Sequence, residues 1–359
     1  MGFDMREVLR AGLDAGLGGG RIEAVERAAR LAAASPRATG LLLQEERALA
    51  EGRPSQSFER AELDALYRGA PDMHAALALL LRMPWLKAQY ERAAIPDAVF
   101  RDTMSDLGIW MEVCRERTGQ YGLIEYGWLV NHFAFRLFRL GRLQFIAGRS
   151  GVPARVYRGA DGAVVALAPD GERYSPSGEA DGTNGLYRPD AWTATLSERD
   201  GRVEGCPIDR RGLAERRTVS LALGDWRPAL SPGDAILEVH VAEGQPLDTA
   251  ECEASLARAP GFFARHLGLI GFRAFTCESW LLDWALQEIA PGGNIARFQD
   301  LFHRVPVRGG DRQTMERVFG GPVDDLGALP QDTSLRRAIV AHYRAGGRCR
   351  EAYGFRLID

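Results

Sequence analysis

The sequence predicts an α+β protein in which a helical N-terminal part precedes a mixed sheet flanked by helices. From residue 5 to about residue 117, apolar residues recur largely at three- and four-residue spacings, as on one face of a helix. Between residues 152 and 219, short β-branched runs alternate with glycine-containing turns, which is typical of strands. Residues 234–267 then read as a strand, a polar loop and a helix, and the rest of the chain is organised around this stretch.

The composition is that of a globular protein with room for two domains. The chain has 359 residues, of which 46% are hydrophobic and 26% charged, and this balance excludes a fibrous or disordered chain. A formal net charge of -3 gives no bulk attraction to nucleic acid or to an anionic membrane. No stretch has the form of a signal peptide or the length of a membrane span. We therefore expect a cytoplasmic protein that binds neither nucleic acid nor membrane.

Five cysteines are scattered along the chain without CxxC spacing: Cys114, Cys206, Cys252, Cys277 and Cys349. An odd number without paired spacing argues for reduced thiols, and against a zinc site or a disulfide framework. We therefore predict no bound metal.

We place the domain boundary between residues 118 and 119. Residues 1–118 are expected to form a helical domain of five or six helices, interrupted by a GLGGG segment and by prolines. The second domain, residues 119–359, is expected to begin with an apolar helix at residues 123–137. A single strand is predicted to follow at residues 139–146.

The predicted strands of the next segment lie at residues 155–157, 163–167, 193–196 and 218–223, and the last of these is expected to precede the central strand directly. Beyond residue 267, we predict a strand at 272–282, helices at 283–289 and 294–302, a strand at 303–307, a helix at 335–343 and a terminal strand at 349–358.

The central strand is predicted at Ala235–Val241, where apolar and partly polar residues alternate. Residues 242–247 contain a glycine and a proline, which suit a turn. Asp248 followed by Glu251 is a capping-box signature for a helix that begins at Thr249. A strand that leads through a loop to a helix start gathers unpaired N–H groups at one spot, and such a spot suits the phosphates of a nucleotide-containing ligand.

The order of elements in the second domain resembles the GCN5-related N-acetyltransferase (GNAT) fold, whose central strand splays from its neighbour to admit acyl-CoA. Four segments resemble those of bacterial acyltransferase-domain proteins that join a helical N-terminal domain to a GNAT-like C-terminal domain: FRLGRLQF at 138–145, VHVAEGQPL at 239–247, CESWLLD at 277–283 and GGNIARF at 292–298. This resemblance is good from residue 102 to residue 302. It implies acyl transfer from acyl-CoA or an acyl carrier protein to an amine, with the thioester as co-substrate and no permanently bound cofactor.

The resemblance implies that the loop after the central strand binds the donor through Val241, Ala242, Glu243, Gly244, Gln245 and Leu247. In relatives this loop usually reads Q/R-x-x-G-x-G/A, and its amides grip the pyrophosphate. Here it has one glycine, an acidic Glu243, and Pro246, which has no N–H. The alternative is that Asp248 and Glu251 cap the following helix and leave no amide for a phosphate. Candidates for the missing positive charge are Arg258, Arg265 and Arg308.

Acyl transfer to an amine requires a group that removes a proton from the amine and a group that protonates the leaving thiolate. His240 shares a face of the central strand with Glu238 and is the first choice as base, because an imidazole titrates near neutrality. The alternative is a histidine that only packs. Glu278, on the next strand, is the second candidate, and Tyr353 is the candidate acid from its place near the terminal strand.

Two further residues have two interpretations each. Asn294 resembles the asparagine that bonds the pantetheine arm in many relatives, and its alternative is to cap the helix that follows it. Cys277 is better explained as a small buried hydrophobe than as a nucleophile, since nothing beside it in sequence favours a thiolate.

The sequence thus predicts a GNAT-like N-acyltransferase that acts on an amine of a small molecule or peptide. Two other classes stay open: a non-catalytic module that binds an acyl thioester or metabolite on the same fold, and a structural scaffold. Glu243 and Pro246 favour these alternatives, whereas His240 and Glu278 on adjacent strands favour an enzyme.

Overall fold

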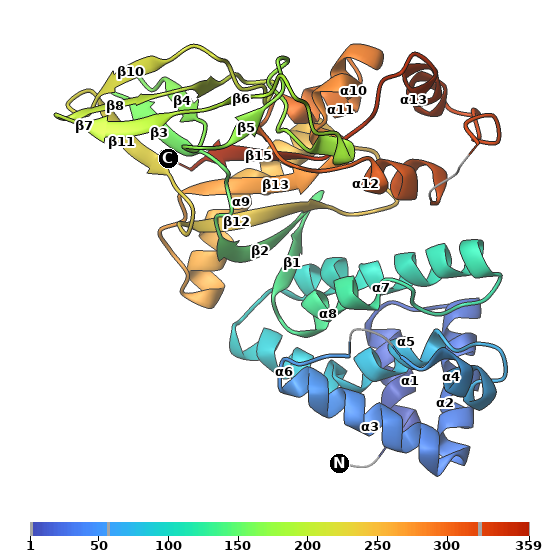
Figure 1. The fold of residues 1–359 in the computed structure, drawn as a ribbon. Helices are drawn as coiled ribbons and strands as arrows, with labels where there is room; N and C mark the ends of the chain where they lie inside the picture. The colour runs from blue at the N-terminus through green and yellow to red at the C-terminus, as the bar shows by residue number, and fades with distance from the viewer. Residues whose placement is uncertain (1–2, 56–57, 322–324, 359) are drawn as a thin grey trace. The chain divides into compact units, whose positions relative to one another are not determined.

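The computed structural model describes residues 3–55, 58–321 and 325–358 (Figure 1). Helices contain 43% of the residues and strands 19%, and the helices come first, which confirms the predicted α+β class. The helical part consists of α1 (Met5–Asp14), α2 (Gly20–Ala34), α3 (Pro36–Ala50), α4 (Arg60–Leu66), α5 (Met73–Leu81), α6 (Met83–Arg92), α7 (Asp97–Thr118) and α8 (Tyr126–Phe133).

More helices form in the first part of the chain than the sequence predicted. In the described residues, seven rather than five or six begin before residue 117. Two of the prolines that separate helices also lie in the first turn of the next helix. Pro36 lies in the first turn of α3, where Ser35 both ends α2 and caps α3, and Pro84 lies in the first turn of α6. A first turn accommodates proline because that N–H has no helical partner in any case.

The segment after α8 is a hairpin, so the helix predicted at residues 123–137 and the single strand predicted at 139–146 are both wrong in extent. β1 (Leu137–Leu140) pairs antiparallel with β2 (Leu143–Arg149). Gly141 has a φ of +83°, a left-handed conformation that glycine adopts without strain. This glycine permits a reversal that the alternation of apolar residues does not reveal.

Six strands form the main sheet, in the order β1-β2-β12-β13-β15-β14. β12 (Ala235–Val241) runs parallel to β13 (Ala274–Ser279). β15 (Ala352–Leu357) lies antiparallel between β13 and β14 (His303–Pro306). The predicted central and terminal strands are therefore confirmed, but β13 is shorter than predicted. It ends where the side chain of Ser279 caps a short 3₁₀ turn.

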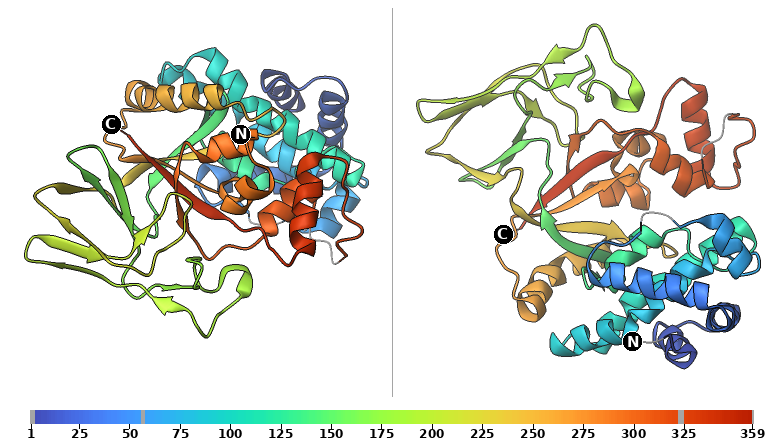
Figure 2. Two further views of the ribbon diagram at one scale, coloured as in Figure 1. Left: turned by 90° about the horizontal axis from the view of Figure 1, so that it is seen from above. Right: turned by 60° about the horizontal axis from the view of Figure 1, so that its bottom comes forward.

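A β-rich segment between β2 and β12 forms sheets of its own, drawn in green and yellow in Figure 2. One has the order β11-β3-β4-β9 and another the order β10-β8-β7, while β5 pairs with β6. β11, and not the strand predicted at 218–223, directly precedes β12. The strands are β3 (Arg155–Gly159), β4 (Val164–Leu167), β5 (Arg173–Tyr174), β6 (Trp192–Thr193), β7 (Leu196–Arg199), β8 (Arg202–Gly205), β9 (Pro207–Ile208), β10 (Val219–Ala222) and β11 (Trp226–Leu230).

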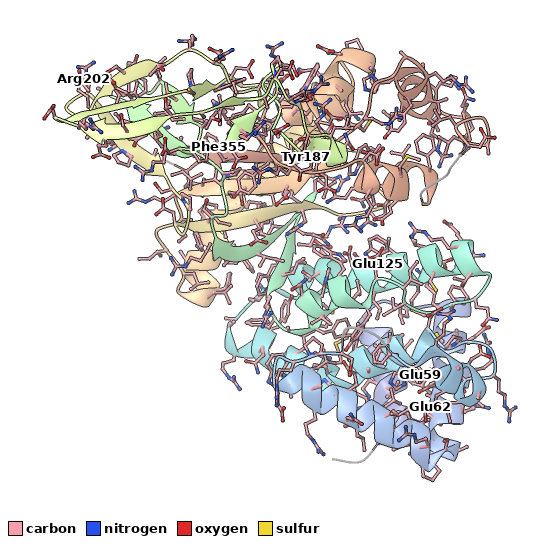
Figure 3. The ribbon with its side chains drawn as sticks, viewed as in Figure 1. Glu59, Glu62, Glu125, Tyr187, Arg202 and Phe355 are labelled. Carbon is pink, nitrogen blue, oxygen red and sulfur yellow. The ribbon has the colours of Figure 1, made fainter. Side chains whose placement is uncertain are left out.

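One face of β12, β13 and β15 packs on this β-rich segment. Ile236, Ala274 and Phe355 share a buried apolar core with residues such as Val156 and Ile208, and Figure 3 labels Phe355 on β15. The later helices are α9 (Thr249–Leu267), α10 (Trp284–Ile289), α11 (Asn294–Gln299), α12 (Arg312–Thr314), the π-helical turn Met315–Phe319 and α13 (Ser334–Arg344).

The chain divides into two compact units. The first comprises residues up to Ile146 together with His240–Pro246 and Ala254–Ile270, and the second comprises Ala147–Val239, Leu247–Glu253 and the chain from Gly271 onward. β2, β12 and α9 each belong in part to both units. Among the helices that the structure describes, none combines the length and the apolar character that crossing a membrane requires.

Candidate active site

β12 pairs with β13 over only part of its length. Three residue pairs join the strands: Ile236 with Ala274, Leu237 with Phe275, and Glu238 with Thr276. Both strands continue, β12 to Val241 and β13 to Ser279, but the described residues show no further pair between them. Separation of the two strands beyond these pairs, toward His240 and Glu278, stays a prediction.

Two of the three predicted catalytic residues lie opposite each other in the second unit. Glu278 on β13 and Tyr353 on β15 are directly paired in the antiparallel register. Residues paired in this way project from the same face of a sheet, with Cβ atoms about 5 Å apart. Glu278 is exposed, whereas Tyr353 is 7% exposed. The sheet therefore places a carboxylate beside a phenol.

The surroundings of Tyr353 keep its phenol protonated. Burial raises the pKa of Tyr353, and hydrogen bonds with Thr276 and Ser150 offset only part of that rise. Thr276 and Ser150 are themselves buried. A phenol that stays protonated at neutral pH has the state required of a group that protonates a leaving thiolate. Thr276 shares its strand face with Glu278 in the sequence pattern, whereas no sequence signal places Ser150 near Tyr353.

The loop after β12 is held by a buried arginine that sequence reasoning missed. Arg142, which immediately precedes β2, is 4% exposed. Its guanidinium donates three hydrogen bonds to carbonyl oxygens of the loop: from Nη1 to Ala242 at 2.9 Å, from Nη2 to Gln245 at 2.8 Å, and from Nε to Pro246 at 2.8 Å. These bonds fix the path of the loop and bring a positive charge against its carbonyl groups.

A second buried arginine holds the side chain of the same loop. Arg139, on β1, donates from Nη2 to Oε1 of Gln245 at 2.9 Å and from Nη1 to Oγ of Ser105 at 3.3 Å. The positive charge near the loop thus comes from Arg139 and Arg142, neither of which was among the arginines suggested by the sequence. Of those three, Arg308 instead binds Glu172.

The loop has amide groups available for a ligand. In the part of the chain that the structure describes, no acceptor takes the N–H of Glu243, Gly244 or Gln245. Gly244 has a φ of +83°, and successive amides around such a residue form a concavity that binds anions. Free N–H groups and a buried guanidinium together make this loop suitable for a phosphate.

Asp248 caps the helix that follows, which is the cap that the alternative predicted. Oδ1 of Asp248 accepts a hydrogen bond from the N–H of Glu251 at 2.9 Å, and α9 begins at Thr249 as predicted. This cap uses an amide of the helix itself. It therefore leaves the amides of the preceding loop unaffected.

Replacing Gly244 by valine is expected to weaken binding of CoA about tenfold, which corresponds to about 1.4 kcal/mol. A Cβ at this position meets no atom within 4 Å, so the cause is the left-handed backbone, which a β-branched residue adopts with strain. Titration calorimetry measures the effect. Gly224→Val is the matched control, because Gly224 also has open space around a Cβ but no left-handed φ. Equal affinity in the two variants contradicts the prediction.

His240, the predicted base, packs against an aromatic side chain of the first unit. Its ring centroid lies 4.8 Å from that of Trp128, in an edge-to-face arrangement. Trp128 also contacts His132, with centroids 5.6 Å apart. Nε2 of His132 lies 3.0 Å from Oδ2 of Asp106, which also accepts a hydrogen bond from Gln144 at 2.8 Å.

The carboxylate of Asp106 holds His132 and Gln144 in place, and with Trp128 and His240 these residues form one cluster. Burial raises the pKa of Asp106, but hydrogen bonds from His132 and Gln144 and the charge of Arg139 outweigh burial and hold the pKa below its usual range. An ionised Asp106 orients His132, and His132 in turn supports the ring of Trp128 that contacts His240. The residues of this cluster come from α7, α8, β2 and β12, and no local sequence pattern connects them.

Asn294 and Cys277 have simpler surroundings. Asn294 is exposed and is the first residue of α11, whose cap is Gly293, so the interpretation of Asn294 as the helix cap is wrong. Its Oδ1 accepts a hydrogen bond from Arg297. Burial raises the pKa of Cys277 to about 12, so its thiol is not a thiolate at neutral pH. The described residues contain no group of three or more metal-ligating side chains.

Two family models match the chain. The model described as the N-acyltransferase N-terminal domain matches residues 13–135, and the model described as the GNAT-like C-terminal domain matches residues 137–356. Among curated proteins, no sequence matches this chain.

Solved structures of acyltransferases share the fold. An acyltransferase mutant in complex with octanoyl-CoA has a TM-score of 0.64 and 22% identity, covering 99% of this chain and 88% of that chain. An acyltransferase in complex with decanoyl-CoA and teicoplanin has a TM-score of 0.63 and 23% identity, and the match again covers 99% of this chain and 88% of that chain. A third, in complex with decanoyl-CoA, has a TM-score of 0.59 and 20% identity over 98% of this chain and 99% of that chain.

Proposed function

Because this chain belongs to the N-acyltransferase family with a GNAT-like C-terminal domain, we propose that it transfers an acyl group from acyl-CoA to an amine of a small molecule or peptide. Family membership confirms the acyltransferase class predicted from the sequence. The observation that carries the choice of CoA is the loop after β12. There the amides of Glu243, Gly244 and Gln245 have no acceptor among the residues that the structure describes, and Arg142 supplies positive charge. Such a loop suits the pyrophosphate of CoA.

The acyl chain is proposed to be of medium length. Two of the similar solved structures are in complex with octanoyl-CoA and decanoyl-CoA. The remaining residues predicted to bind the donor, Val241, Ala242, Leu247 and Asn294, keep that role as part of the proposal. Exposure of Asn294 leaves its amide accessible to a ligand such as the pantetheine arm.

In the proposed reaction, the amine nitrogen attacks the thioester carbonyl carbon, so that a C–N bond forms and the C–S bond breaks. His240 takes the proton that the amine loses. Tyr353 gives its phenolic proton to the departing thiolate, since its raised pKa keeps that proton in place until charge develops on sulfur. Glu278, opposite Tyr353, is the second candidate for the base, acting through water.

Tyr353→Phe is expected to lower turnover about 100-fold, at the lower end of the range for removing a general acid. The ring remains, so affinity for CoA and the melting temperature should stay close to wild type. Tyr174→Phe is the matched control, because Tyr174 is a buried tyrosine of the same unit that belongs to the β-rich segment. Steady-state rates of the two variants test the prediction. A Tyr353→Phe enzyme as fast as the control removes Tyr353 as the acid.

One experiment tests the proposed function as a whole. Titration calorimetry with CoA is followed by incubation with octanoyl-CoA or decanoyl-CoA and a set of amines, with release of the free thiol as the readout. Binding together with amine-dependent thiol release is the expected result. Binding without release for any amine favours the non-catalytic module, and no binding favours an acyl carrier protein as donor. Mass spectrometry of CoA or acyl thioesters that co-purify with the protein gives an independent check.

Two other predictions join this proposal. The division into domains at residues 1–118 and 119–359 is tested by limited proteolysis, which should cut first near the boundary. A cytoplasmic location is also part of the proposal, and it is supported by the five scattered cysteines, all of them buried as free thiols. Fractionation of the cells that make the protein tests the location.

A further inference from the structure

The helical part of the first unit contains a hollow outside the site described above. It has a volume of about 670 Å³ and lies between α2, the turn after α4 and the end of α7. Its floor is apolar, formed by side chains that are at least 95% buried: Ala24, Ala28, Tyr67 and Met73. A volume of this size is within the usual range for small-molecule sites.

The mouth of this hollow is basic. Four arginines line it, and the lining includes no acidic residue: Arg27, Arg30, Arg68 and Arg115. Two of them have carboxylate partners, since Arg30 pairs with Glu26 and Arg115 with Glu112. Neither Arg27 nor Arg68 is bound to another side chain in the residues that the structure describes. Both guanidiniums are therefore available to a ligand at the mouth.

Two groups near the hollow are engaged elsewhere or neutral, whereas Glu23 and Asp64, each four residues before one of these arginines, are exposed to solvent. Glu62, labelled on α4 in Figure 3, accepts two hydrogen bonds from Arg37, at 2.6 and 3.1 Å. Burial raises the pKa of Tyr67, so its phenol stays neutral. Arg68 also has a left-handed φ of +51°, which is unusual for a residue other than glycine. Strained residues of this kind concentrate where ligands are held.

We propose that the hollow binds a medium-chain carboxylate, with the chain on the apolar floor and the carboxylate between Arg27 and Arg68. An apolar floor of alanine, methionine and tyrosine accepts an alkyl chain, and a guanidinium fork matches a carboxylate better than any uncharged head group. This inference goes beyond acyl transfer, because it assigns the helical part a ligand site of its own.

The test uses octanoate and octanol as probes, measured by titration calorimetry on the whole chain. Wild type should bind octanoate at least tenfold more tightly than octanol, because the two share the chain and differ in charge. The Arg27→Gln/Arg68→Gln double variant should lose at least tenfold in octanoate affinity and keep its octanol affinity. Both arginines are exposed, so the variant should fold as wild type does. Arg47→Gln/Arg101→Gln is the matched control, since these exposed arginines do not line the hollow.

Several results overturn the proposal. It fails if wild type binds no octanoate, if octanol binds as tightly as octanoate, or if the Arg27→Gln/Arg68→Gln variant binds octanoate as the control does. Ala28→Trp, which fills the floor, should abolish binding of both probes. The Arg27→Gln/Arg68→Gln variant should also retain CoA affinity, so that failure of this inference is distinguishable from failure of the acyl-CoA proposal.

Discussion

A His240→Ala protein should keep its fold and its affinity for CoA and lose most of its turnover. Removal of a general base typically lowers the rate on the order of 10²- to 10⁴-fold, whereas removal of a packing histidine mainly lowers stability. The edge-to-face contact with Trp128 predicts a small loss of stability as well. Rate, CoA affinity and melting temperature, measured on one preparation, separate the two roles.

His266→Ala is the matched control for His240→Ala. His266 is a half-buried histidine of the same unit, and its Nδ1 lies 3.1 Å from the carbonyl oxygen of Ala93. It should lose some stability and keep its rate. If His240→Ala unfolds, or works at an undiminished rate, Glu278 becomes the better candidate for the base.

The helices and strands predicted correctly are those whose sequence patterns, such as alternation or a capping box, lie within a few neighbouring residues. β12 follows from its alternation, and the start of α9 follows from the spacing of Asp248 and Glu251, because a strand face and a helix cap are local features. The hairpin of β1 and β2 was missed because the left-handed turn at Gly141 interrupts a run that otherwise reads as one strand.

The candidate site could be predicted only in part, because its contacts join residues far apart in the chain. Glu278 and Tyr353 were each predicted, but only the register of β13 and β15 shows that they are opposite each other. Arg142 could not be found from the sequence, since its bonds reach carbonyls about a hundred positions away. Every residue type has a backbone carbonyl, so the acceptors of a buried arginine of this kind cannot be recognised from their side chains.

A distant residue also explains why the loop after β12 can differ from the family motif. The loop has only one glycine, and Pro246 has no N–H to offer a phosphate. The structure shows that Pro246 has another use, since its carbonyl oxygen accepts a hydrogen bond from Nε of Arg142. The proline restricts the backbone at the point where the guanidinium holds it. The loop is therefore fixed by the side chain of Arg142, from the turn between β1 and β2, rather than by repeated glycines.

The Arg142→Met variant should lose about 100-fold in affinity for CoA, which corresponds to about 2.7 kcal/mol. Three hydrogen bonds from a charged donor are lost, each worth about 1.5–3 kcal/mol in isolation and less in combination. The loop amides lose their fixed arrangement at the same time. Arg142→Lys keeps the charge but cannot bond three carbonyls at once, so its affinity should fall between those of wild type and Arg142→Met.

Arg304→Met separates an effect on the loop from a general loss of stability. Arg304 is 3% exposed and donates to neutral oxygens of Arg210, Gln299 and Gln287, so its removal also deletes a buried guanidinium. Both methionine variants should melt at a lower temperature than wild type, but only Arg142→Met should lose CoA affinity. Calorimetry below the melting temperature of both proteins decides the matter. If a folded Arg142→Met protein binds CoA as tightly as Arg304→Met does, the loop after β12 does not hold the pyrophosphate.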